Sequence, residues 1–469
     1  SWSNGRKVGG AATLTSYFKL EAEGADRPAV ILDGGDVMQG TPISNLTKGR
    51  STVSFFNAAG YRGVAIGNHD FDWTVSVLRA RMAQAKFRWL SANVFVAGTD
   101  RQPAWAKPTA LIAAGDVKIG IIGLSTEDTP ITTKASNVVG LEFRSGSAAI
   151  DKWTPVLRKA GADFVIVVAH SGALCDASFT KCEGEIVEWA RNTHDKPDLI
   201  VAGHTHRLVK WVENGIPIVE AGSYTTRYGV IDLARDSAGV HTWIHDFPTP
   251  FEDRVTPDPA VAALVAKAER EIGPQVKRVI ATFADTIRRA GSGEAALGNL
   301  IADAFRASAN AQLSFVNNGS IRIAELPAGP TTWGTLYSLQ PFENRIVVLT
   351  MSGAQVRDVV EFSLRGSTPD MHISGMKVSY DAAAPAGRRV QRMTLLSGEE
   401  IQDNGSYTVS VTDFLATGSG DGYRAFGQAR RRTDTNLTDL EALIHYLQAL
   451  PQPVRVDLAE RRFQSVPNQ

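Results

Sequence analysis

Four continuous apolar runs stand out in the first half of the chain, at residues 29–32, 64–66, 164–169 and 199–202. Runs rich in Val and Ile predict strands that are buried on both faces, as in a helix-covered sheet. Each run stops at residues that can bind a metal: Asp33-Gly34-Gly35-Asp36, Gly67-Asn68-His69-Asp70-Phe71-Asp72, His170-Ser171-Gly172 and Gly203-His204-Thr205-His206. Because such sheets bind ligands just beyond the carboxyl ends of their strands, we expect these side chains to converge at one edge.

Helical stretches alternate with strands from Gly9 to about Asp246. Small or apolar residues at helical spacing predict helices over 9–23, 51–60, 74–87, 147–160 and 185–192, and further apolar runs predict strands over 118–124, 216–222 and 228–233. This alternation is typical of a layered α/β domain. A chain of 469 residues is also long enough for two domains.

The pattern changes after a helix predicted over 257–272. Beyond Gly273-Pro274 the order is less regular, with helices over 294–309 and 438–447 and strands over 313–316, 345–351, 376–380 and 407–411. Such an order predicts an α+β domain. We therefore expect an N-terminal α/β domain over 1–256, a linker helix over 257–275 and a C-terminal domain over 276–469.

Charge and hydropathy exclude two classes of partner. Lys and Arg together number 49, as do Asp and Glu, and no basic run stands out, so no nucleic-acid polymer is expected as a partner. No apolar stretch approaches the roughly 20 residues that a membrane helix needs. Residues 1–7 are polar and unlike a signal peptide, so a mature or trimmed chain is expected.

The two cysteines, Cys175 and Cys182, lie seven residues apart in a polar loop after His170. A disulfide between them would indicate an oxidising compartment. The alternative is a soft metal pair, but the spacing is not C-x-x-C and no second pair exists. We favour the disulfide, and with it a periplasmic or extracellular, bacterial-like location.

Histidines concentrate at the four strand ends, which hold four of the nine: His69, His170, His204 and His206. A single histidine beside a strand is usually structural, whereas four such ends favour a metal site. Asp, Asn and His ligands without thiolates suit Zn²⁺, Mn²⁺ or a similar ion. Two metals about 3.5–4 Å apart can clamp the attacking and leaving oxygens of a phosphoryl transfer.

Three of these motifs, Gly35-Asp36, Gly67-Asn68-His69-Asp70 and Gly203-His204-Thr205-His206, occur with His170 in an order that resembles the calcineurin-like metallophosphoesterases. The second half resembles the C-terminal domain of the 5′-nucleotidase family at residues 296–304, 317–322, 340–344 and 414–423. That family includes bacterial UDP-sugar hydrolases and animal ecto-5′-nucleotidases. The resemblance covers nearly the whole chain.

The resemblance implies a site with two divalent ions. Asp36 would bridge both metals, Asn68, His170 and His204 would complete one site, and His206 would belong to the other. His69 would act as a catalytic residue oriented by Asp72, because a histidine held by a carboxylate can stabilise developing charge or protonate a leaving group.

The resemblance also implies a nucleotide site in the C-terminal domain. Phe342 and Phe414 would stack on the base, although core packing is the usual fate of Phe. Polar contacts to the base, phosphate or ribose would be made by Asn317, Arg322 and Asn344. The acidic residue that binds the ribose would be Asp421.

The sequence departs from the family at two places. The family begins with a strand ending in Asp-x-His, which supplies the other ligands of the His206 metal, and residues 1–8 contain neither Asp nor His. We expect either that a preceding segment carries this motif, which we favour, or that the second metal is held poorly. In addition, Ser419 lengthens the glycine loop before Asp421 by one residue.

The expected activity is metal-dependent removal of the 5′-phosphate from nucleotides, extending to UDP-sugars or cyclic nucleotides, by a monomer or weak oligomer. One alternative is a thiosulfohydrolase-like or other non-nucleotide ester hydrolase of the same superfamily. Another is a non-catalytic nucleotide-binding protein with an incomplete metal site.

Overall fold

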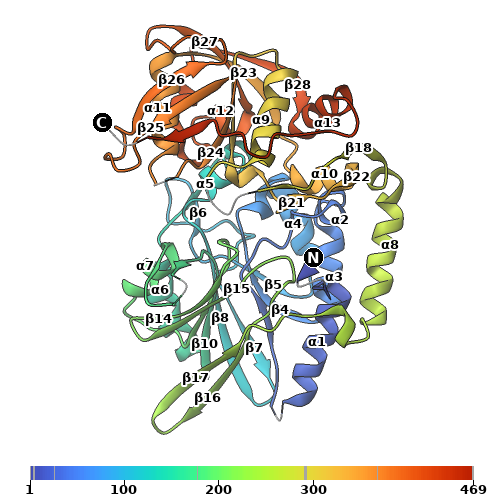
Figure 1. Ribbon diagram of the computed structural model, residues 1–469. Coiled ribbons are helices and arrows are strands. Elements are labelled where there is room, and N and C mark those ends of the chain that lie inside the picture. The colour runs from blue at the N-terminus through green and yellow to red at the C-terminus, as the bar shows by residue number, and fades with distance from the viewer. Residues whose placement is uncertain are drawn as a thin grey trace. The chain divides into compact units, whose positions relative to one another are not determined.

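The chain forms two compact units in a computed structural model, which describes residues 2–3, 6–25, 27–176, 178–289, 293–366 and 368–466 (Figure 1). The first unit comprises Ser1–Gln39 and Ile43–Glu271, and the second comprises Gly40–Pro42 and Ile272–Gln469. The domain boundaries expected from the sequence, with a linker over 257–275, stay a prediction.

The first unit contains a six-stranded sheet in the order β14-β15-β13-β10-β8-β7. Its central strands are parallel, and its two edge strands pair antiparallel with their neighbours. The bounds are β7 Thr109–Ala114, β8 Val117–Ser125, β10 Phe164–His170, β13 Leu199–Val201, β14 Leu208–Glu213 and β15 Ile216–Ala221. All residues of β10 are buried, as its uninterrupted apolar run predicts.

A second sheet of three parallel strands faces the first. Its strands are β3 Ile31–Asp33, β4 Tyr61–Ala65 and β5 Arg88–Leu90. One apolar cluster joins Ala65 and Leu90 of this sheet to Ile121 and Ile166 of the larger one. The hairpin of β16 Val230–Asp236 and β17 Gly239–Asp246 also packs against this cluster.

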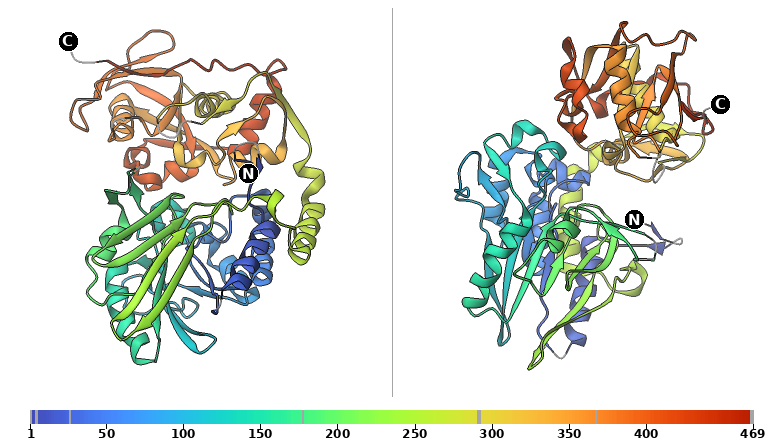
Figure 2. Two further views of the ribbon diagram at one scale, coloured as in Figure 1. Left: turned by 60° about the horizontal axis from the view of Figure 1, so that its bottom comes forward. Right: turned by 90° about the vertical axis from the view of Figure 1, so that its left-hand side faces the viewer.

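Helices cover the outer faces of both sheets. The larger sheet packs against α6 Gly146–Lys159 and α7 Glu185–Arg191. The smaller sheet packs against α1 Ala11–Gly24, α3 Arg50–Ala59 and α4 Thr74–Gln84. In Figure 1 these layers run from α6 and α7 at the left to α1 and α3 at the right, and the left view of Figure 2 also shows the blue helices to one side of the green strands.

The layered α/β class expected from the sequence is confirmed. The expectation of one sheet edge is wrong, because two of the four apolar runs form β3 and β4, whereas the other two form β10 and β13 of the facing sheet. A strand covered by a second sheet is as apolar on both faces as one covered by helices, so the pattern of residues does not distinguish the two.

The two sheets approach closely at Gly123 of β8. A Cβ atom there would lie 2.2 Å from the Leu90 Cβ and 2.4 Å from the Leu90 carbonyl carbon. Because Leu90 backbone cannot move aside cheaply, we expect Gly123→Ala to destabilise the protein by about 1–3 kcal/mol. Chemical denaturation followed by circular dichroism would measure the change in unfolding free energy.

Gly273→Ala is a matched control for that change. Gly273 lies inside α8 Pro259–Val276, and a Cβ there would meet no atom within 4 Å outside its two chain neighbours. Alanine has the higher helix propensity, but its Cβ would lie next to the Pro274 ring, so the two effects oppose each other and the unfolding free energy should change by less than about 1 kcal/mol. Equal destabilisation of both variants would contradict close packing at Gly123.

The second unit is built on a five-stranded mixed sheet in the order β24-β20-β27-β23-β28. Its strands are β20 Leu313–Asn317, β23 Arg345–Ser352, β24 Met371–Ser374, β27 Ser406–Thr412 and β28 Arg431–Thr438. A three-stranded sheet adjoins it, with β25 Met376–Tyr380, β26 Val390–Leu395 and β29 Phe463–Ser465.

Three main helices cover the second unit's sheet. The helix α9 Ala296–Ser308 packs against β20, β24 and α13 Asp439–Ala449, and α11 Gly353–Ser363 packs into the core that β23 and β27 share. In Figure 1, α9 is yellow and α13 is red. This arrangement of a mixed sheet with helices confirms the α+β class predicted for the second half.

The remaining elements are short. The helices are α2 Pro42–Leu46, α5 Thr129–Thr132, α10 Trp333–Leu339 and α12 Asp413–Ala416. The small strand pairs are β1 Trp2–Ser3 with β2 Arg6–Lys7, β6 Val94–Val96 with β9 Leu141–Phe143, β18 Val279–Phe283 with β22 Gly329–Thr332, and β19 Ile287–Arg288 with β21 Glu325–Leu326.

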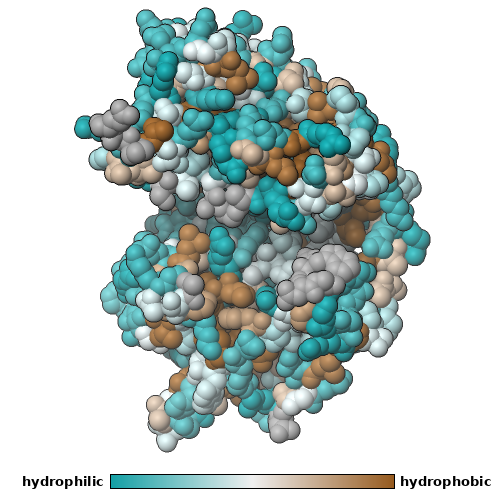
Figure 3. Space-filling model, in the orientation of Figure 1, coloured by the Kyte–Doolittle hydropathy of each residue, from teal (hydrophilic) through white to brown (hydrophobic). Residues whose placement is uncertain are grey.

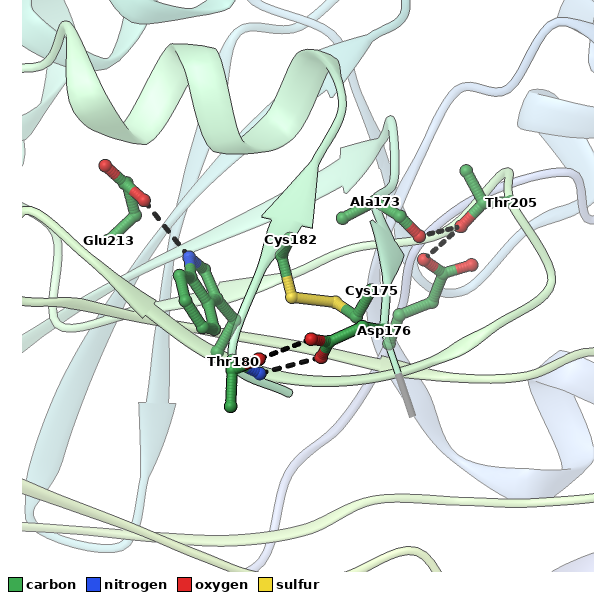
Figure 4. The surroundings of a disulfide bond; sticks show 9 residues. Ala173, Cys175, Asp176, Thr180, Cys182, Thr205 and Glu213 are labelled. Carbon is green, nitrogen blue, oxygen red and sulfur yellow. Dashed lines mark hydrogen bonds between the residues drawn. A yellow bond between two sulfur atoms is a disulfide. The ribbon is translucent and has the colours of Figure 1, made fainter. Parts of the chain in front are cut away.

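The surface drawn in Figure 3 carries apolar residues in small groups among hydrophilic ones. No helix in the described part of the chain has both the length and the apolar character that a membrane crossing requires. A disulfide joins Cys175 and Cys182 across the hairpin of β11 Leu174–Cys175 and β12 Cys182–Glu183 (Figure 4).

Candidate active site

Asp36 lies in the turn that follows β3. The turn is held by the Asp33 Oδ1, which accepts a hydrogen bond from the Gly35 backbone N at 2.9 Å. Asp36 itself has a φ of 57°, a region that residues with a side chain rarely adopt. Its Oδ1 accepts from the His69 backbone N at 2.9 Å. This bond ties the turn after β3 to the turn after β4.

Asn68 and His69 follow β4, where a 3₁₀ turn His69–Phe71 begins. The buried Asp70 carboxylate fixes this region, because it accepts from the Gly67 backbone N at 2.8 Å and the Met38 backbone N at 3.0 Å. The Asn68 Nδ2 donates to the Thr132 carbonyl at 3.0 Å. The amide oxygen of Asn68 therefore points away from Thr132.

His170 ends β10 and is almost fully buried. Its Nδ1 lies 2.9 Å from the Gly34 carbonyl oxygen, which can only accept, so Nδ1 carries the proton. Its Nε2 then faces the Asp36 Oδ2 at 3.0 Å, the Asn68 Oδ1 at 3.0 Å and the His204 Nδ1 at 3.2 Å. The structure thus brings together Asp36, Asn68, His170 and His204.

Burial and the charges of neighbouring groups shift the pKa values of the residues in this cluster in different directions. Burial acts to lower the pKa of His170, but the Asp36 carboxylate outweighs it and raises this pKa to about 9. Burial and the neighbouring His170 lower the pKa of His204 to about 3. Although burial acts to raise the pKa of Asp36, the nearby histidines hold it well below its usual range.

The donor set fits a divalent metal. A carboxylate oxygen, an amide oxygen and two imidazole nitrogens are the ligand types that Zn²⁺ and Mn²⁺ accept, and here they meet without a thiolate. In the described residues no group of three or more His, Cys, Asp or Glu side chains is placed so that it could hold a metal ion without other ligands. Here the Asp36, Asn68 and His204 donor atoms each contact the His170 Nε2, and one of these ligands is an asparagine.

His69 and Asp72 form a pair beside this cluster. The His69 Nδ1 lies 2.9 Å from the Asp72 Oδ2, and both side chains are mostly buried. The Thr133 hydroxyl donates to the other carboxylate oxygen of Asp72 at 2.9 Å, and the Asn137 Nδ2 donates to the Asp72 carbonyl at 2.8 Å. The segment around α5 therefore orients both the carboxylate of Asp72 and the amide of Asn68.

His204 and His206 follow β13 in a turn with unusual backbone angles. Their φ values are 80° and 57°, a sparsely populated region that persists only where the surroundings hold it. The ring of His206 lies against Tyr224, with ring centroids 5.5 Å apart. Such outliers concentrate at functional sites.

Asn317 and Asp421 meet in the second unit, because the Asn317 Nδ2 donates to the Asp421 Oδ2 at 2.6 Å. The Arg322 guanidinium carbon lies 5.6 Å from the centre of the half-buried Phe342 ring. Asn344 is buried, and its backbone N donates to the Asp439 Oδ2 at 3.2 Å.

Phe414 lies on α12 and packs partly against the core of the second unit. The glycine loop that follows is tightly folded on it, since a Cβ at Gly420 would lie 2.5 Å from the Phe414 carbonyl oxygen. Within the loop the Ser419 backbone N donates to the Thr417 Oγ1 at 3.2 Å. Ser419 is thus held inside the loop by this hydrogen bond.

Four residues that support the site were not predicted from the sequence: Asp70 as a clamp, Thr132, Thr133 and Asn137. Asp70 belongs to the motif Gly67-Asn68-His69-Asp70, so the sequence already indicated that it lies near the site. The other three lie more than 60 residues from the groups that they contact, in a segment without any apolar run or motif. Only the tertiary fold reveals them.

Two segments of the chain, which together contain these motifs, match known protein families. The calcineurin-like phosphoesterase family matches residues 7–208, and the 5′-nucleotidase C-terminal domain matches residues 274–428. The chain belongs to the calcineurin-like phosphoesterases that carry a 5′-nucleotidase C-terminal domain. This phosphoesterase is accordingly a phosphoric ester hydrolase, as the sequence predicts.

Relatives of this phosphoesterase align along most of its length. Endonuclease YhcR of Bacillus subtilis is 29% identical over an alignment of 471 residues, which covers 95% of this chain but 38% of that protein. Snake venom 5′-nucleotidase of Naja atra is 27% identical over an alignment of 455 residues, which covers 88% of this chain and 85% of that protein. The structure of a 5′-nucleotidase precursor from Thermus thermophilus superposes with a TM-score of 0.84 and 26% identity, covering 99% of this chain and 95% of that chain.

Proposed function

We propose that this phosphoesterase removes the 5′-phosphate from nucleotides with the help of two divalent metal ions. The observation that carries the proposal is the cluster around the His170 Nε2, where the Asp36, Asn68 and His204 donor atoms lie within 3.2 Å. Beside it stands the His69–Asp72 pair. UDP-sugars and cyclic nucleotides are further candidate substrates.

Asp36, Asn68, His170 and His204 would hold one metal, and Asp36 would share the second with His206. Bound metals would polarise phosphoryl oxygens and lower the pKa of water toward neutrality, which supplies a nucleophile. Asp72 would accept the Nδ1 proton of His69, and when the ring is protonated on both nitrogens its Nε2 can donate to a phosphoryl or leaving-group oxygen. Thr133 keeps the Asp72 carboxylate in place for this task.

The proposal is tested by a screen for activity with a matched metal analysis. The purified chain would be stripped with EDTA, reloaded with Zn²⁺, Mn²⁺ or Co²⁺, and assayed with nucleoside monophosphates, UDP-sugars and cyclic nucleotides. We expect turnover of AMP that depends on bound metal. Absence of both metal uptake and turnover with every ion would refute the proposal.

The second unit would bind the nucleoside. Phe342 and Phe414 would stack on the base, and the Arg322 guanidinium over the Phe342 ring adds a positive charge at the same place. The Asn317 amide holds the Asp421 carboxylate, so this acid is positioned to accept from ribose hydroxyls. Asn344 would contribute a further polar contact.

We expect Phe342→Ala and Phe414→Ala each to lower kcat/KM for AMP by roughly 10–100-fold. Stacking is worth about 1–3 kcal/mol per base, and each 1.4 kcal/mol corresponds to about tenfold. The loss should appear mainly in KM, because the rings contact the base and not the reacting phosphate. Steady-state kinetics with AMP measures both constants.

Phe95→Ala is the matched control for Phe342→Ala, since Phe95 is also a half-buried ring with an arginine, Arg144, 4.2 Å over its centre. Its kinetics should equal those of the wild type. Unchanged AMP turnover in both Phe342→Ala and Phe414→Ala would instead favour an ester substrate without a base, such as a thiosulfate ester.

The Cys175–Cys182 disulfide supports a periplasmic or extracellular location, because disulfides persist in oxidising compartments.

A further inference from the structure

Glu220 stands out as a buried charged residue outside the set of catalytic and metal-binding residues. It lies on β15 and is 1% exposed. A carboxyl group that is buried so completely needs hydrogen-bond partners to offset the loss of water. Those partners come from the turn that carries His204 and His206.

The Glu220 carboxyl group contacts this turn at two points. Its Oε2 lies 2.6 Å from the Thr205 Oγ1. In the sequence, Thr205 stands between His204 and His206. Its Oε1 accepts from the Arg207 backbone N at 3.2 Å, directly after His206. One side chain therefore holds the turn on both sides of His206.

The same turn is attached to the segment that follows His170. The Thr205 Oγ1 also lies 3.0 Å from the Ala173 carbonyl oxygen, and the two dashed lines at Thr205 in Figure 4 mark both of its contacts. A Cβ at Gly172 would lie 2.4 Å from the Gly203 carbonyl oxygen and 2.6 Å from the Glu220 Oε2. Gly172, the turn at Gly203 and the Glu220 carboxyl group are thus closely packed.

We propose that Glu220 is a positioning residue for the metal site, acting through Thr205 and Arg207 on His204 and His206. The backbone of both histidines has a positive φ, a conformation that needs support from its surroundings. The hydrogen bonds of Glu220 give that support. Groups that orient metal ligands in this way affect metal affinity although they do not touch the metal. The inference rests on the metal ligands assigned under the proposed function.

The Ala173 carbonyl and the Glu220 carboxyl group both lie within hydrogen-bond distance of the Thr205 hydroxyl. Because this hydroxyl has one proton, it can donate to only one of them at a time. Glutamine at position 220 can keep both contacts with the turn, because its Oε1 accepts from the Arg207 backbone N and its Nε2 donates to the Thr205 Oγ1. Glu220→Gln should therefore keep the function that Glu220→Ala removes. Thr205→Ser and Thr205→Val form a second such pair.

The test measures Co²⁺ binding to the purified full chain by isothermal titration and by the visible absorption spectrum of the bound ion. We expect Glu220→Ala and Thr205→Val to weaken Co²⁺ binding by roughly 10–100-fold and to change the spectrum. Glu220→Gln and Thr205→Ser should stay close to the wild type. Turnover of AMP at saturating Co²⁺, measured in parallel, should recover in part for Glu220→Ala and Thr205→Val.

Two controls separate positioning from general stability. Glu213→Ala removes a carboxyl group from the adjoining strand β14 that bonds the Arg191 Nε at 2.9 Å and the Trp211 Nε1 at 3.1 Å. Thr193→Val removes a buried hydroxyl that donates to the Trp189 carbonyl at 2.8 Å. Both should bind Co²⁺ as the wild type does, whatever their melting temperatures.

The proposal is overturned if Thr205→Val binds Co²⁺ with the affinity and spectrum of the wild type, a result that counts even if Glu220→Ala does not fold. Loss of Co²⁺ binding in both controls as well would also overturn it, because any destabilisation would then suffice. A wild type that binds no Co²⁺ would refute the proposed function itself, so the two failures are distinguishable.

Discussion

His69→Asn is expected to lower the turnover of AMP by roughly 10²–10⁴-fold while the metal content of the protein stays unchanged. The His69 backbone N, which donates to the Asp36 Oδ1 at 2.9 Å, is retained in this variant. Only the imidazole that the Asp72 carboxylate orients at 2.9 Å is lost. The steady-state kcat and elemental analysis of the purified protein measure the two quantities.

His194→Asn provides a control with the same geometry at the surface. The His194 Nδ1 lies 3.0 Å from the Asp151 Oδ2, but its side chain is 89% exposed. Its replacement should leave both turnover and metal content unchanged. If His69→Asn retained full activity, the catalytic role that we assign to His69 and Asp72 would be wrong.

Asp36→Asn should abolish most of the activity, by roughly 10³-fold or more, and also reduce the bound metal. Asp36 is proposed to bridge both ions, so the substitution removes the single negative charge that the two ions would share, and metal-based charge stabilisation is worth several kcal/mol. Asparagine still offers an oxygen to the His69 backbone N, so the turn itself should persist. Metal equivalents and AMP turnover, measured on the same sample, report both effects.

Asp198→Asn separates this effect from lost stability. The Asp198 carboxylate binds the Arg158 guanidinium at 2.6 Å and accepts from the Val165 backbone N, at the end of β10 opposite to His170. We expect a lower melting temperature and a normal metal content. If Asp36→Asn bound metal as tightly as the wild type, Asp36 would not be a metal ligand.

The apolar runs predicted the buried strands well because a strand that is covered on both faces must be apolar at every position. They did not predict which strands share a sheet, since this depends on pairing between residues far apart in the chain. Ile66 and Ala202 directly follow two equally apolar strands, β4 and β13, yet these strands lie in different sheets.

Motif spacing indicated the site residues only where neighbours in sequence are also neighbours in space. His69 and Asp72 are three residues apart, so a short turn brings them together. The contact of Thr133 with Asp72 spans 61 residues and that of Glu220 with Thr205 joins a strand to a turn. Threonine and glutamate are common residues, so nothing but the fold distinguishes these two from the others.

The donor atoms of the proposed metal-binding cluster come from segments far apart in the chain. The contact between Asn68 and His170 spans 102 residues, and that between Gly34 and His170 spans 136. During synthesis the cluster cannot be complete until His204 has left the ribosome, long after β3 and β4 have been made. Contacts of such long range form slowly, so a newly made chain passes through a period in which the strands β3 and β4 have been made but the segment that carries His204 has not.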